Sequence, residues 1–437
     1  MKPVKIGLLG LGTVGSGVIN LLHRNAMEIS RRAGRNISVK TAVVRDVKAS
    51  RQCETRSFNV SNDLKDVTDD PEIDIVIELI GGTKIAKDAI HQALNHRKHV
   101  VTANKALIAE FGNEIFSLAL EKKLTVAFEA AVGGGISVIK VLREGLSGNV
   151  INRVTGIING TSNFILTDMF QNNVEFSDSL NEAVKLGFAE ADPESDIQGI
   201  DAAHKLAILA SIAYGIPLQF EKVYVEGITD ITAEDMLYAK DLGYRIKHLG
   251  IAVRRDDGLE LRAHPCLITS NELLANVNGV MNAICIEGDA VGSTLHYGAG
   301  AGSEPTASAV VADIVDVVRT HTTDPNSRVP HLAFQPQSLS DLRILDAAKT
   351  NVAFYLRLNV HEKAGVLADI TRILGERTIS IEKIVQKEVT SKNGTVPIVI
   401  ISHKTIEQKM NVAIKEIESL ECVKGKISRI RLETFGS

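Results

Sequence analysis

Near its start the chain reads Val4-Lys5-Ile6-Gly7-Leu8-Leu9-Gly10-Leu11-Gly12-Thr13-Val14-Gly15. The apolar run predicts a strand, and the helical spacing of the apolar residues after it predicts a helix from about Thr13. A G-x-G-x-x-G segment between a strand and a helix is typical of a dinucleotide site. Gly10 allows the tight turn, Gly12 lets backbone approach a pyrophosphate, and Gly15 lets the helix pack on the strand. The segment therefore predicts an α/β, Rossmann-type doubly wound domain; the alternative is a glycine-rich turn that binds nothing.

The second predicted strand, residues 38–44, ends in a charged segment that bears on the choice of dinucleotide. Asp46 could accept a hydrogen bond from a ribose 2′-hydroxyl, which would favour NAD. Arg45, Lys48 and Arg51 could instead neutralise a 2′-phosphate, which would favour NADP. Three cations against one carboxylate favour NADP, and use of both cofactors stays open.

Two later strands are expected at residues 73–80 and 99–102 of the same sheet. The second delivers Lys105 to the carboxyl edge, where doubly wound folds bind ligands, so we expect Lys105 to contact cofactor or substrate rather than only solvent. A further strand, residues 124–128, leads to Glu129 and then to Gly133-Gly134-Gly135. From spacing alone we favour a flexible turn there over an oxygen-lined cation site.

The stretch from Ala189 to Lys205 is the most chemically loaded part of the chain. It holds five carboxylates and a lysine, and Pro193 stops any helix from running through it. A helix is expected from Ile197, on which Asp201 and Lys205 share a face as an i, i+4 pair. An exposed surface ion pair is the ordinary interpretation, but the residues around this pair are nearly all apolar. Because desolvation lowers the pKa of an ammonium group toward the range useful for proton transfer, the pair is a candidate acid/base.

Length and composition exclude several classes of protein. The chain has 437 residues, 44% of them hydrophobic and 23% charged, which is ordinary for two or three globular domains. A net charge of −4 gives no reason to expect nucleic acid or a membrane as partner. The four cysteines have neither metal nor disulfide spacing, and there is no signal peptide or spanning apolar run. A cytoplasmic protein with reduced thiols is expected.

The remaining chain divides by pattern into three parts. Residues 136–320 predict an α+β mixed-sheet domain, in which a loop of small residues, 298–306, precedes a helix. Residues 321–351 are proline-bearing and predict a linker, and residues near 305–345 could pack back on the first domain, 1–135. Residues 352–437 read β-α-β-β-α-β, which predicts a ferredoxin-like module.

Several of these motifs together resemble one enzyme family. The motifs are residues 10–15, Thr102 to Ala106, Glu129 to Gly135, Gly156 to Thr161, Glu190 to Lys205 and Gly298 to Thr306. In this order the chain resembles homoserine dehydrogenases of the monofunctional kind with a C-terminal ACT domain. The resemblance implies NAD(P)H-dependent, reversible reduction of L-aspartate 4-semialdehyde to L-homoserine, in threonine, methionine and isoleucine biosynthesis.

The resemblance also implies roles for single residues. Lys205 would be the general acid/base, Asp201 would orient it, and Lys105 would assist catalysis beside nicotinamide and substrate. The mixed-sheet domain, residues 136–320, would be the catalytic and dimerisation domain, and in it Glu190 and Asp196 would bind or position the substrate. The cofactor contacts implied by the motif and the family are Gly10, Gly12, Thr13, Val14, Gly15, Arg45, Lys105 and Gly302. A Na⁺ or K⁺ site would use Glu129, Val132, Gly134 and Ile136, which reverses the interpretation from spacing alone.

The ACT resemblance is less specific, because many such domains have an Asp-x-Pro-Gly turn where this chain has Glu362-Lys363-Ala364-Gly365. Feedback binding of an amino acid such as L-threonine, or a role in assembling a homodimer or homotetramer, both stay open. Two other functions remain as alternatives. A related aldehyde-oxidising enzyme would need a cysteine nucleophile, and no cysteine lies in a motif. A non-catalytic dinucleotide sensor would not need Asp201 and Lys205.

Overall fold

The computed structural model describes residues 2–190, 192–386 and 394–435. The chain forms two compact units that alternate along the sequence. The first comprises Met1–Ile158, Asp201–Val223 and Met281–Leu342, and the second comprises Asn159–Ile200, Tyr224–Val280 and Arg343–Ser437. The predicted domain boundaries are sequential, and they remain predictions.

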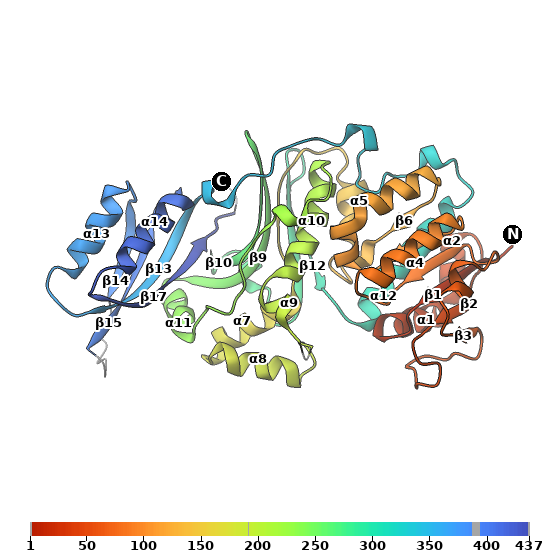
Figure 1. Cartoon of the computed structure of the whole chain (residues 1–437), viewed down its shortest axis with the longest axis horizontal. Coiled ribbons are helices and arrows are strands. Elements are labelled where there is room, and N and C mark those ends of the chain that lie inside the picture. The colour runs from red at the N-terminus through yellow and green to blue at the C-terminus, as the bar shows by residue number, and fades with distance from the viewer. Residues whose placement is uncertain (1, 191, 387–393, 436–437) are drawn as a thin grey trace. The chain divides into compact units, whose positions relative to one another are not determined.

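A six-stranded parallel sheet organises the first unit (Figure 1), in the order β3-β2-β1-β4-β5-β6. This is the strand order of dinucleotide-binding doubly wound folds, so the predicted fold class is confirmed. The strands are β1 (Val4–Leu9), β2 (Ile37–Val43), β3 (Asn59–Ser61), β4 (Ile75–Glu78), β5 (His99–Thr102) and β6 (Val126–Ala127). The helices between them are α1 (Thr13–Arg24), α2 (Ala26–Ala33), α3 (Lys65–Thr68), α4 (Lys84–Asn95) and α5 (Lys105–Glu121).

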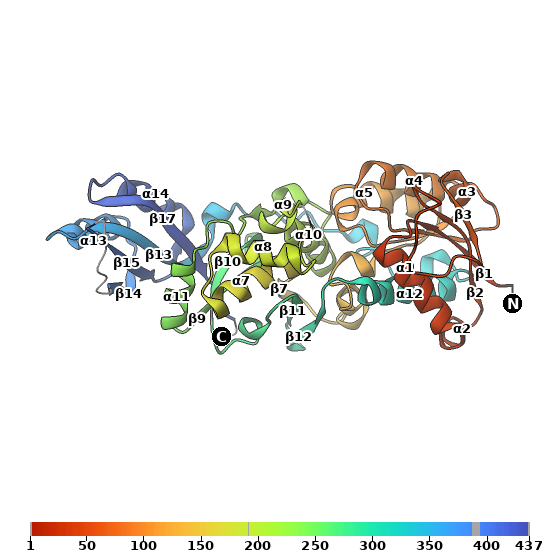
Figure 2. The same cartoon turned by 90° about the horizontal axis from the view of Figure 1, so that it is seen from below.

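Helix α12 (Ser303–Thr320) lies beside α1 in both views of the chain (Figures 1 and 2). Its apolar face, including Val310 and Ile314, shares one core with Leu8 and Val18. The helix begins at Ser303, four residues earlier than the small-residue loop had predicted. Only a glycine-rich turn, with Gly302 at φ 119°, separates it from the strand before it, β12 (Gly292–Ala299).

The rest of the first unit includes a three-stranded antiparallel segment and one buried helix. Strand β11 (Met281–Gly288) pairs with β7 (Ile151–Ile157) on one side and with β12 on the other. Helix α10 (Ile200–Tyr214) is buried along almost its whole length. It begins at Ile200 and not at the predicted Ile197, because Gly199 adopts a φ of 81° and ends the short helix α9 (Glu194–Ile197).

In the second unit, helices and strands surround a second apolar core. The helices besides α9 are α7 (Gly160–Asn172), α8 (Phe176–Lys185) and α11 (Ala233–Asp241). The strands β9 (Tyr244–Arg255) and β10 (Gly258–Thr269) form a long antiparallel pair, and β8 (Tyr224–Val225) runs parallel to β10. This is the mixed sheet that the alternating pattern predicted.

The last part of the chain is the predicted ferredoxin-like module, with strand order β17-β13-β15-β14. Its elements are β13 (Asn351–His361), α13 (Val366–Glu376), β14 (Ile381–Gln386), β15 (Thr395–Ser402), β16 (Thr405–Ile406), α14 (Glu407–Glu418) and β17 (Val423–Leu432). The strand predicted over 379–389 ends outside the described residues. Strand β17 also pairs in parallel with β10, joining the module to the sheet of the second unit.

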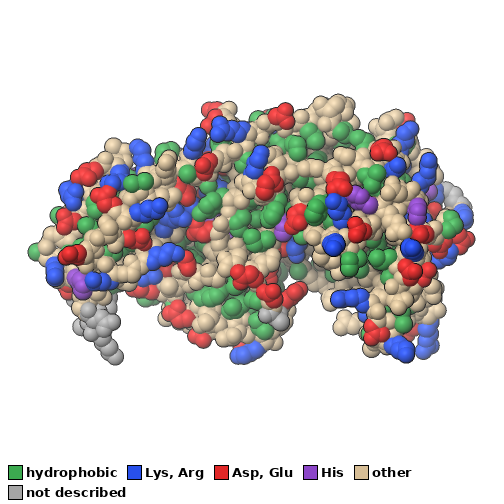
Figure 3. Space-filling view, viewed as in Figure 1, with side chains coloured by type: hydrophobic (Ala, Val, Ile, Leu, Met, Phe, Trp, Pro, Cys, Tyr) green, Lys and Arg blue, Asp and Glu red, His purple; other side chains and the backbone are tan. Residues whose placement is uncertain are grey.

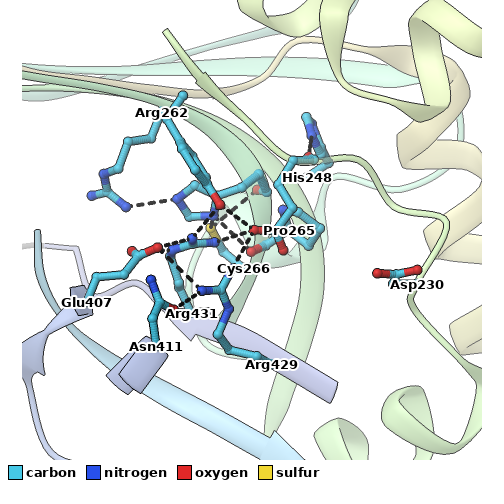
Figure 4. Close-up of polar contacts among 12 residues, drawn as sticks. Asp230, His248, Arg262, Pro265, Cys266, Glu407, Asn411, Arg429 and Arg431 are labelled. Atoms are coloured by element: carbon cyan, nitrogen blue, oxygen red, sulfur yellow. Dashed lines mark hydrogen bonds and ion pairs between the residues drawn. The ribbon is translucent and has the colours of Figure 1, made fainter. Parts of the chain in front are cut away.

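Buried charges accompany that joint (Figure 4). Arg431, at 0% exposure, donates to Glu407 and, over 2.9 Å, to Glu226. Arg429 donates to the same Glu226 carboxylate oxygen, and Arg262 pairs with Glu433. The outer surface is different, because Lys or Arg and Asp or Glu side chains are interspersed on the face in Figure 3. No helix among the described residues is long and apolar enough to cross a membrane.

Candidate active site

Two lysines share one buried carboxylate in the first unit. Lys205 Nζ lies 2.7 Å from Asp201 Oδ2, and Lys105 Nζ lies 2.9 Å from Asp201 Oδ1. Asp201 is 2% exposed and Lys205 is 8% exposed, whereas the Lys105 side chain is 43% exposed. The i, i+4 ion pair expected from spacing is therefore present and is buried, so the surface-pair interpretation is wrong. Lys105, from a distant segment, completes the set.

The direction of the Lys205 side chain is fixed at two points. Besides Asp201, its Nζ donates over 2.8 Å to the backbone carbonyl of Ile158, the residue after β7. The helix that carries it is packed with buried alanine, leucine and isoleucine side chains. A lysine loses much rotamer freedom when it is held this way, so its amine can be aimed at a reacting atom before substrate binds.

Asp201 stays ionised at this site. Burial alone would raise the pKa of Asp201, but the charges and hydrogen bonds of Lys205 and Lys105 outweigh burial and leave that pKa well below its usual range. The carboxylate therefore carries one negative charge between two ammonium groups. The net positive charge of the three side chains suits an oxygen that gains negative charge during reaction.

Lys105 is positioned by a network that sequence reasoning missed. Asn104 caps α5 by accepting from Leu107 N, and its amide donates to the Gly82 carbonyl over 2.6 Å. Thr102 donates over 2.6 Å to Glu78, which is fully buried and also accepts from backbone after β4. An asparagine directly before a helix was a visible N-cap signal. Glu78, within the apolar run of a predicted strand, could also be recognised in the sequence, but its pairing with Thr102 could not.

His204 lies between Asp201 and Lys205 in the sequence of α10, and its side chain faces α5. Its Nε2 is 3.2 Å from Glu110 Oε1 on α5, and its ring lies 4.1 Å from the Phe220 ring. Burial lowers the pKa of His204, with the Glu110 carboxylate opposing that shift. This histidine joins the two helices that carry the lysines, and no sequence motif indicated that role.

The glycine turn has the geometry that a pyrophosphate requires. Gly10 has a φ of 105°, and a Cβ on Gly15 would lie 2.2 Å from the Gly10 carbonyl oxygen. A Cβ on Gly12, in contrast, would meet nothing within 4 Å, so space is open above the turn. Gly12 is the N-cap residue of α1 and has no side chain to cap the helix. The first turn of α1, which starts with Thr13 and Val14, has no acidic residue. Its N–H groups therefore fit an anion.

The start of α12 adjoins this turn, which places Gly302 near the predicted cofactor site. Ser303 Oγ donates over 2.8 Å to the Thr13 carbonyl, and a Cβ on Gly17 would lie 2.7 Å from Ser303. After β2, Arg45 is exposed, and Asp46 is engaged locally by the Lys48 N–H and by the Arg51 guanidinium. Arg45 and Lys48 are therefore the exposed basic residues after β2, whereas the Arg51 guanidinium donates to the Asp46 carbonyl.

Gly133 and Gly134 of the glycine triplet are buried, whereas Gly135 is exposed. Glu129 is 1% exposed and accepts from the N–H groups of Ile139 and Lys140, both over 2.9 Å. Burial, and then the nearby Asp313, raise the pKa of Glu129 to about 7. Gly134 has a φ of 51°, so its backbone is turned out of the strand direction. A buried carboxylate beside turned backbone fits a monovalent cation, whose charge would offset the cost of burial.

The two predicted substrate residues, Glu190 and Asp196, belong to the second unit. Glu190 is exposed between α8 and α9, and Asp196 Oδ1 accepts from Asn159 Nδ2 over 2.7 Å. Asn159 also caps α7 by accepting from Ser162 N. The sequence motif Asn159-Gly160-Thr161-Ser162 carried this capping signal, although the partnership with Asp196 was not predicted.

Comparisons with known proteins agree over the whole chain. Family models described as "Homoserine dehydrogenase, NAD binding domain", "Homoserine dehydrogenase" and "ACT domain" match residues 10–129, 138–315 and 354–422. A homoserine dehydrogenase of Pseudomonas aeruginosa is 58% identical over 433 residues, 99% of each chain. The solved homoserine dehydrogenase of Thiobacillus denitrificans superposes with a TM-score of 0.95 at 57% identity, covering 100% of this chain and 99% of that one.

A more distant solved structure is a hyperthermophilic archaeal homoserine dehydrogenase in complex with NADPH. It is 26% identical, has a TM-score of 0.59, and covers 72% of this chain and 97% of its own.

Proposed function

The chain belongs to the homoserine dehydrogenase family of oxidoreductases, and we propose that it catalyses the reversible, NAD(P)H-dependent reduction of L-aspartate 4-semialdehyde to L-homoserine. The observation that carries this proposal is the buried carboxylate with two lysines bonded to it, in the same unit as an intact dinucleotide turn. A sensor that only binds dinucleotide would have no need of a buried lysine held at two points.

Lys205 is the general acid/base. A bound reduced dinucleotide would supply the hydride to the aldehyde carbon. The Lys205 ammonium gives a proton to the carbonyl oxygen, so that the C=O group becomes CH–OH. Asp201 orients the amine and keeps its ionised neighbours together. Lys105, half exposed on the other oxygen of Asp201, stabilises the developing oxygen charge and relays a proton from solvent to Lys205. In homoserine oxidation the same groups act in reverse.

Two carboxylates bind the substrate's amino-acid end. Glu190 is exposed, which suits acceptance of a hydrogen bond from the α-ammonium. Asp196 is held in one orientation by Asn159, which suits positioning of the substrate. Their negative charges select a substrate that carries a cation.

The cofactor binds along the glycine turn and the start of α12. Gly10, Gly12, Thr13, Val14 and Gly15 hold the pyrophosphate, Gly302 lies beside it, and Lys105 approaches the nicotinamide. We favour NADP over NAD, because Arg45 is exposed while the Asp46 carboxylate is already engaged by local backbone. The archaeal relative's NADPH complex is consistent with this preference.

A Na⁺ or K⁺ ion binds the Glu129 carboxylate with the carbonyl oxygens of Val132, Gly134 and Ile136. The raised pKa of Glu129, to about 7, supports this role, because a bound cation would keep the carboxylate ionised at neutral pH. The ion's task is structural, since it would fix the turn that leads from the nucleotide-binding sheet to the rest of the first unit.

The ACT domain gives feedback control by an end product such as L-threonine. Its turn from His361 to Val366 precedes α13 and could hold an amino acid's charged groups. We further propose that the enzyme is cytoplasmic and works as a homodimer or homotetramer, with no nucleic acid or membrane partner. The predicted division at residues 135, 320 and 351 is kept as the domain proposal.

A spectrophotometric assay tests the whole scheme. L-homoserine is oxidised with NADP or NAD as acceptor, with and without L-threonine, and in sodium, potassium or choline chloride. We expect turnover with both cofactors, faster with NADP, and inhibition by L-threonine. No turnover, together with tight NADPH binding, would favour the dinucleotide sensor instead.

A further inference from the structure

A cavity of about 590 Å³ lies within the first unit, apart from the lysine–carboxylate site. Its walls are the C-terminal half of α5 and the segment 324–339 that follows α12, here called the arm. Pro217, just after α10, closes one side. None of the lysine, carboxylate or glycine-turn residues described above lines it. The volume is within the range, about 300–1,000 Å³, that holds small organic molecules in proteins.

The arm is fixed against the helices, so this cavity has defined walls. The His331 ring stacks on the Phe116 ring at 4.9 Å, and its Nε2 accepts from Val126 N over 3.0 Å. Phe334 packs on Gly215, where an added Cβ would lie 2.8 Å from its ring. Arg328 Nη1 donates over 2.9 Å to the Lys123 carbonyl. A linker without a ligand-binding role would not need a cavity enclosed by so many fixed contacts.

The lining is mostly apolar and is basic where it is charged. Phe116, Leu124, Leu332 and Leu339 are among the apolar lining residues, and the charged ones are Lys123 and Arg328. Neither aspartate nor glutamate lines the cavity. His331 is neutral at pH 7, because burial lowers the pKa of its ring to about 4. The cavity therefore favours an apolar body that ends in an anion.

Arg328 is short of partners within the part of the chain that is described. Its Nε is buried and donates to no protein group, and no carboxylate oxygen lies within the 4.0 Å of an ion pair. Burial lowers the pKa of Arg328, with only Asp324 opposing that shift electrostatically. Arg328 Nη1 donates to the Lys123 carbonyl and, over 3.4 Å, to Thr125 Oγ1, and Nε has no accessible surface. A guanidinium can bind a carboxylate with two parallel hydrogen bonds, and here the carboxylate would meet the Nη1–Nη2 edge.

We propose that this cavity binds a small monocarboxylate with an apolar body, its carboxylate held by Arg328. The ligand would rest on the ends of α5 and α10 opposite to those that carry Lys105 and Asp201. Asn113 already joins these ends by two hydrogen bonds with the Leu218 backbone. The inference does not depend on the reaction proposed above.

Isothermal titration calorimetry on the full-length chain tests the site, with octanoate as probe and octanol as its uncharged counterpart. We expect saturable octanoate binding with one site per chain, and binding of octanol about tenfold weaker or more. Arg328→Gln should weaken octanoate about ten- to hundredfold. Ser117→Phe, on the face of α5 that lines the cavity, should weaken octanoate binding, because the added ring takes up part of the cavity.

Arg56→Gln is the matched control, because its side chain is 94% exposed and lies outside the cavity; it should bind octanoate as the unmodified chain does. Circular dichroism and homoserine oxidation establish that each variant is folded. The proposal is overturned if octanoate does not bind, if folded Ser117→Phe binds it unchanged, or if octanol binds as tightly as octanoate. Because catalysis is measured separately, a failure here leaves the proposed reaction untouched.

Discussion

At the scale of single residues, the same fold perturbs carboxylates in opposite directions. Asp201 is buried between two lysines, and its pKa is lowered despite burial. Glu129 and Asp313 are buried beside one another, and burial raises their pKa values to about 7 and about 6. The charged groups beside a buried carboxylate, rather than the extent of its burial, decide whether its pKa is raised or lowered. The first arrangement keeps Asp201 ionised, and the second is the site at which we propose that a cation binds.

The Lys205 assignment predicts a selective loss. Lys205→Ala should lower kcat for homoserine oxidation about a thousandfold, because Lys205 exchanges the proton with the substrate and Lys105 acts through it. The Kd for NADPH, measured by fluorescence, should change less than about threefold, since Lys205 is not at the glycine turn. Lys185→Ala, with a side chain 73% exposed, is the control and should match the unmodified enzyme. Unchanged turnover in Lys205→Ala would remove the assignment.

The Glu129 site predicts a pH effect whose sign is fixed by its raised pKa. A carboxyl with a higher pKa in the folded chain stabilises the fold while protonated. Its contribution is complete below its ordinary value of 4.5 and is lost as pH rises through about 7. In choline chloride, the unfolding free energy of the unmodified chain should therefore fall by about 2–4 kcal/mol between pH 5 and pH 8, measured by urea denaturation. Glu129→Gln should remove this fall.

Sodium chloride at equal ionic strength should restore stability at pH 8 in the unmodified chain but not in Glu129→Gln. Glu121→Gln, with a side chain 68% exposed, serves as control and should behave like the unmodified chain. The cation proposal fails if sodium and choline salts give the same stability at pH 8.

At the scale of elements, the contact between α1 and α12 shows how a helix late in the chain completes a site that begins at its start. Gly17 has room only for hydrogen, because a Cβ would lie 2.7 Å from Ser303 backbone and side-chain oxygens. Ser303 in turn donates to Thr13 in the first turn of α1. The distance between the two helices is therefore set by a glycine that is not part of the dinucleotide motif.

Gly17→Ala should separate the two helices and disturb the cofactor site. We expect a loss of about 1–3 kcal/mol in unfolding free energy and a rise in the Kd for NADPH, because backbone must move to admit the methyl group. Gly145→Ala is the matched control, since an added Cβ there meets nothing within 4 Å. Equal stability and NADPH affinity in the two variants would show that the close approach at Gly17 is relaxed without cost.

At the scale of the whole molecule, charges from distant parts of the chain are buried together in the second unit. Arg431 reaches Glu407 on α14 and Glu226 beside β8, and its guanidinium lies 4.9 Å from the Tyr224 ring (Figure 4). Burial would raise the pKa of Glu226, but Arg431 and Arg429 lower it. This contribution to stability is present above the unfolded pKa of Glu226 and is lost in acid.

Substitution of Arg431 should lower the unfolding free energy more than substitution of an exposed charged residue. Arg431→Met leaves Glu407 and Glu226 without their buried partner, so we expect a loss of about 3–5 kcal/mol in unfolding free energy. Adding Glu407→Gln should recover part of it, because one uncompensated charge disappears. Arg372→Met, whose side chain is 55% exposed, should change stability little. A small effect of Arg431→Met would mean that water reaches these carboxylates.

The sequence by itself determined the local structure and the identity of the chemical groups. The glycine turn, the strands that precede helices, the i, i+4 pair and the order of the ferredoxin-like module all follow from short-range periodicity and φ preferences. The starts of α10 and α12 were misplaced by a few residues, because glycines interrupt or allow helices according to backbone angles that composition does not reveal.

Only the tertiary structure decided which groups meet. Lys105 joins Asp201, the Ile158 carbonyl aims Lys205, and Glu78 supports the segment before Lys105, each across a long stretch of chain. The cavity behind the arm and the raised pKa of Glu129 also arise from packing. Local patterns fix the elements, whereas burial and pairing depend on contacts between segments that are distant in sequence, and those contacts set the electrostatics of the site.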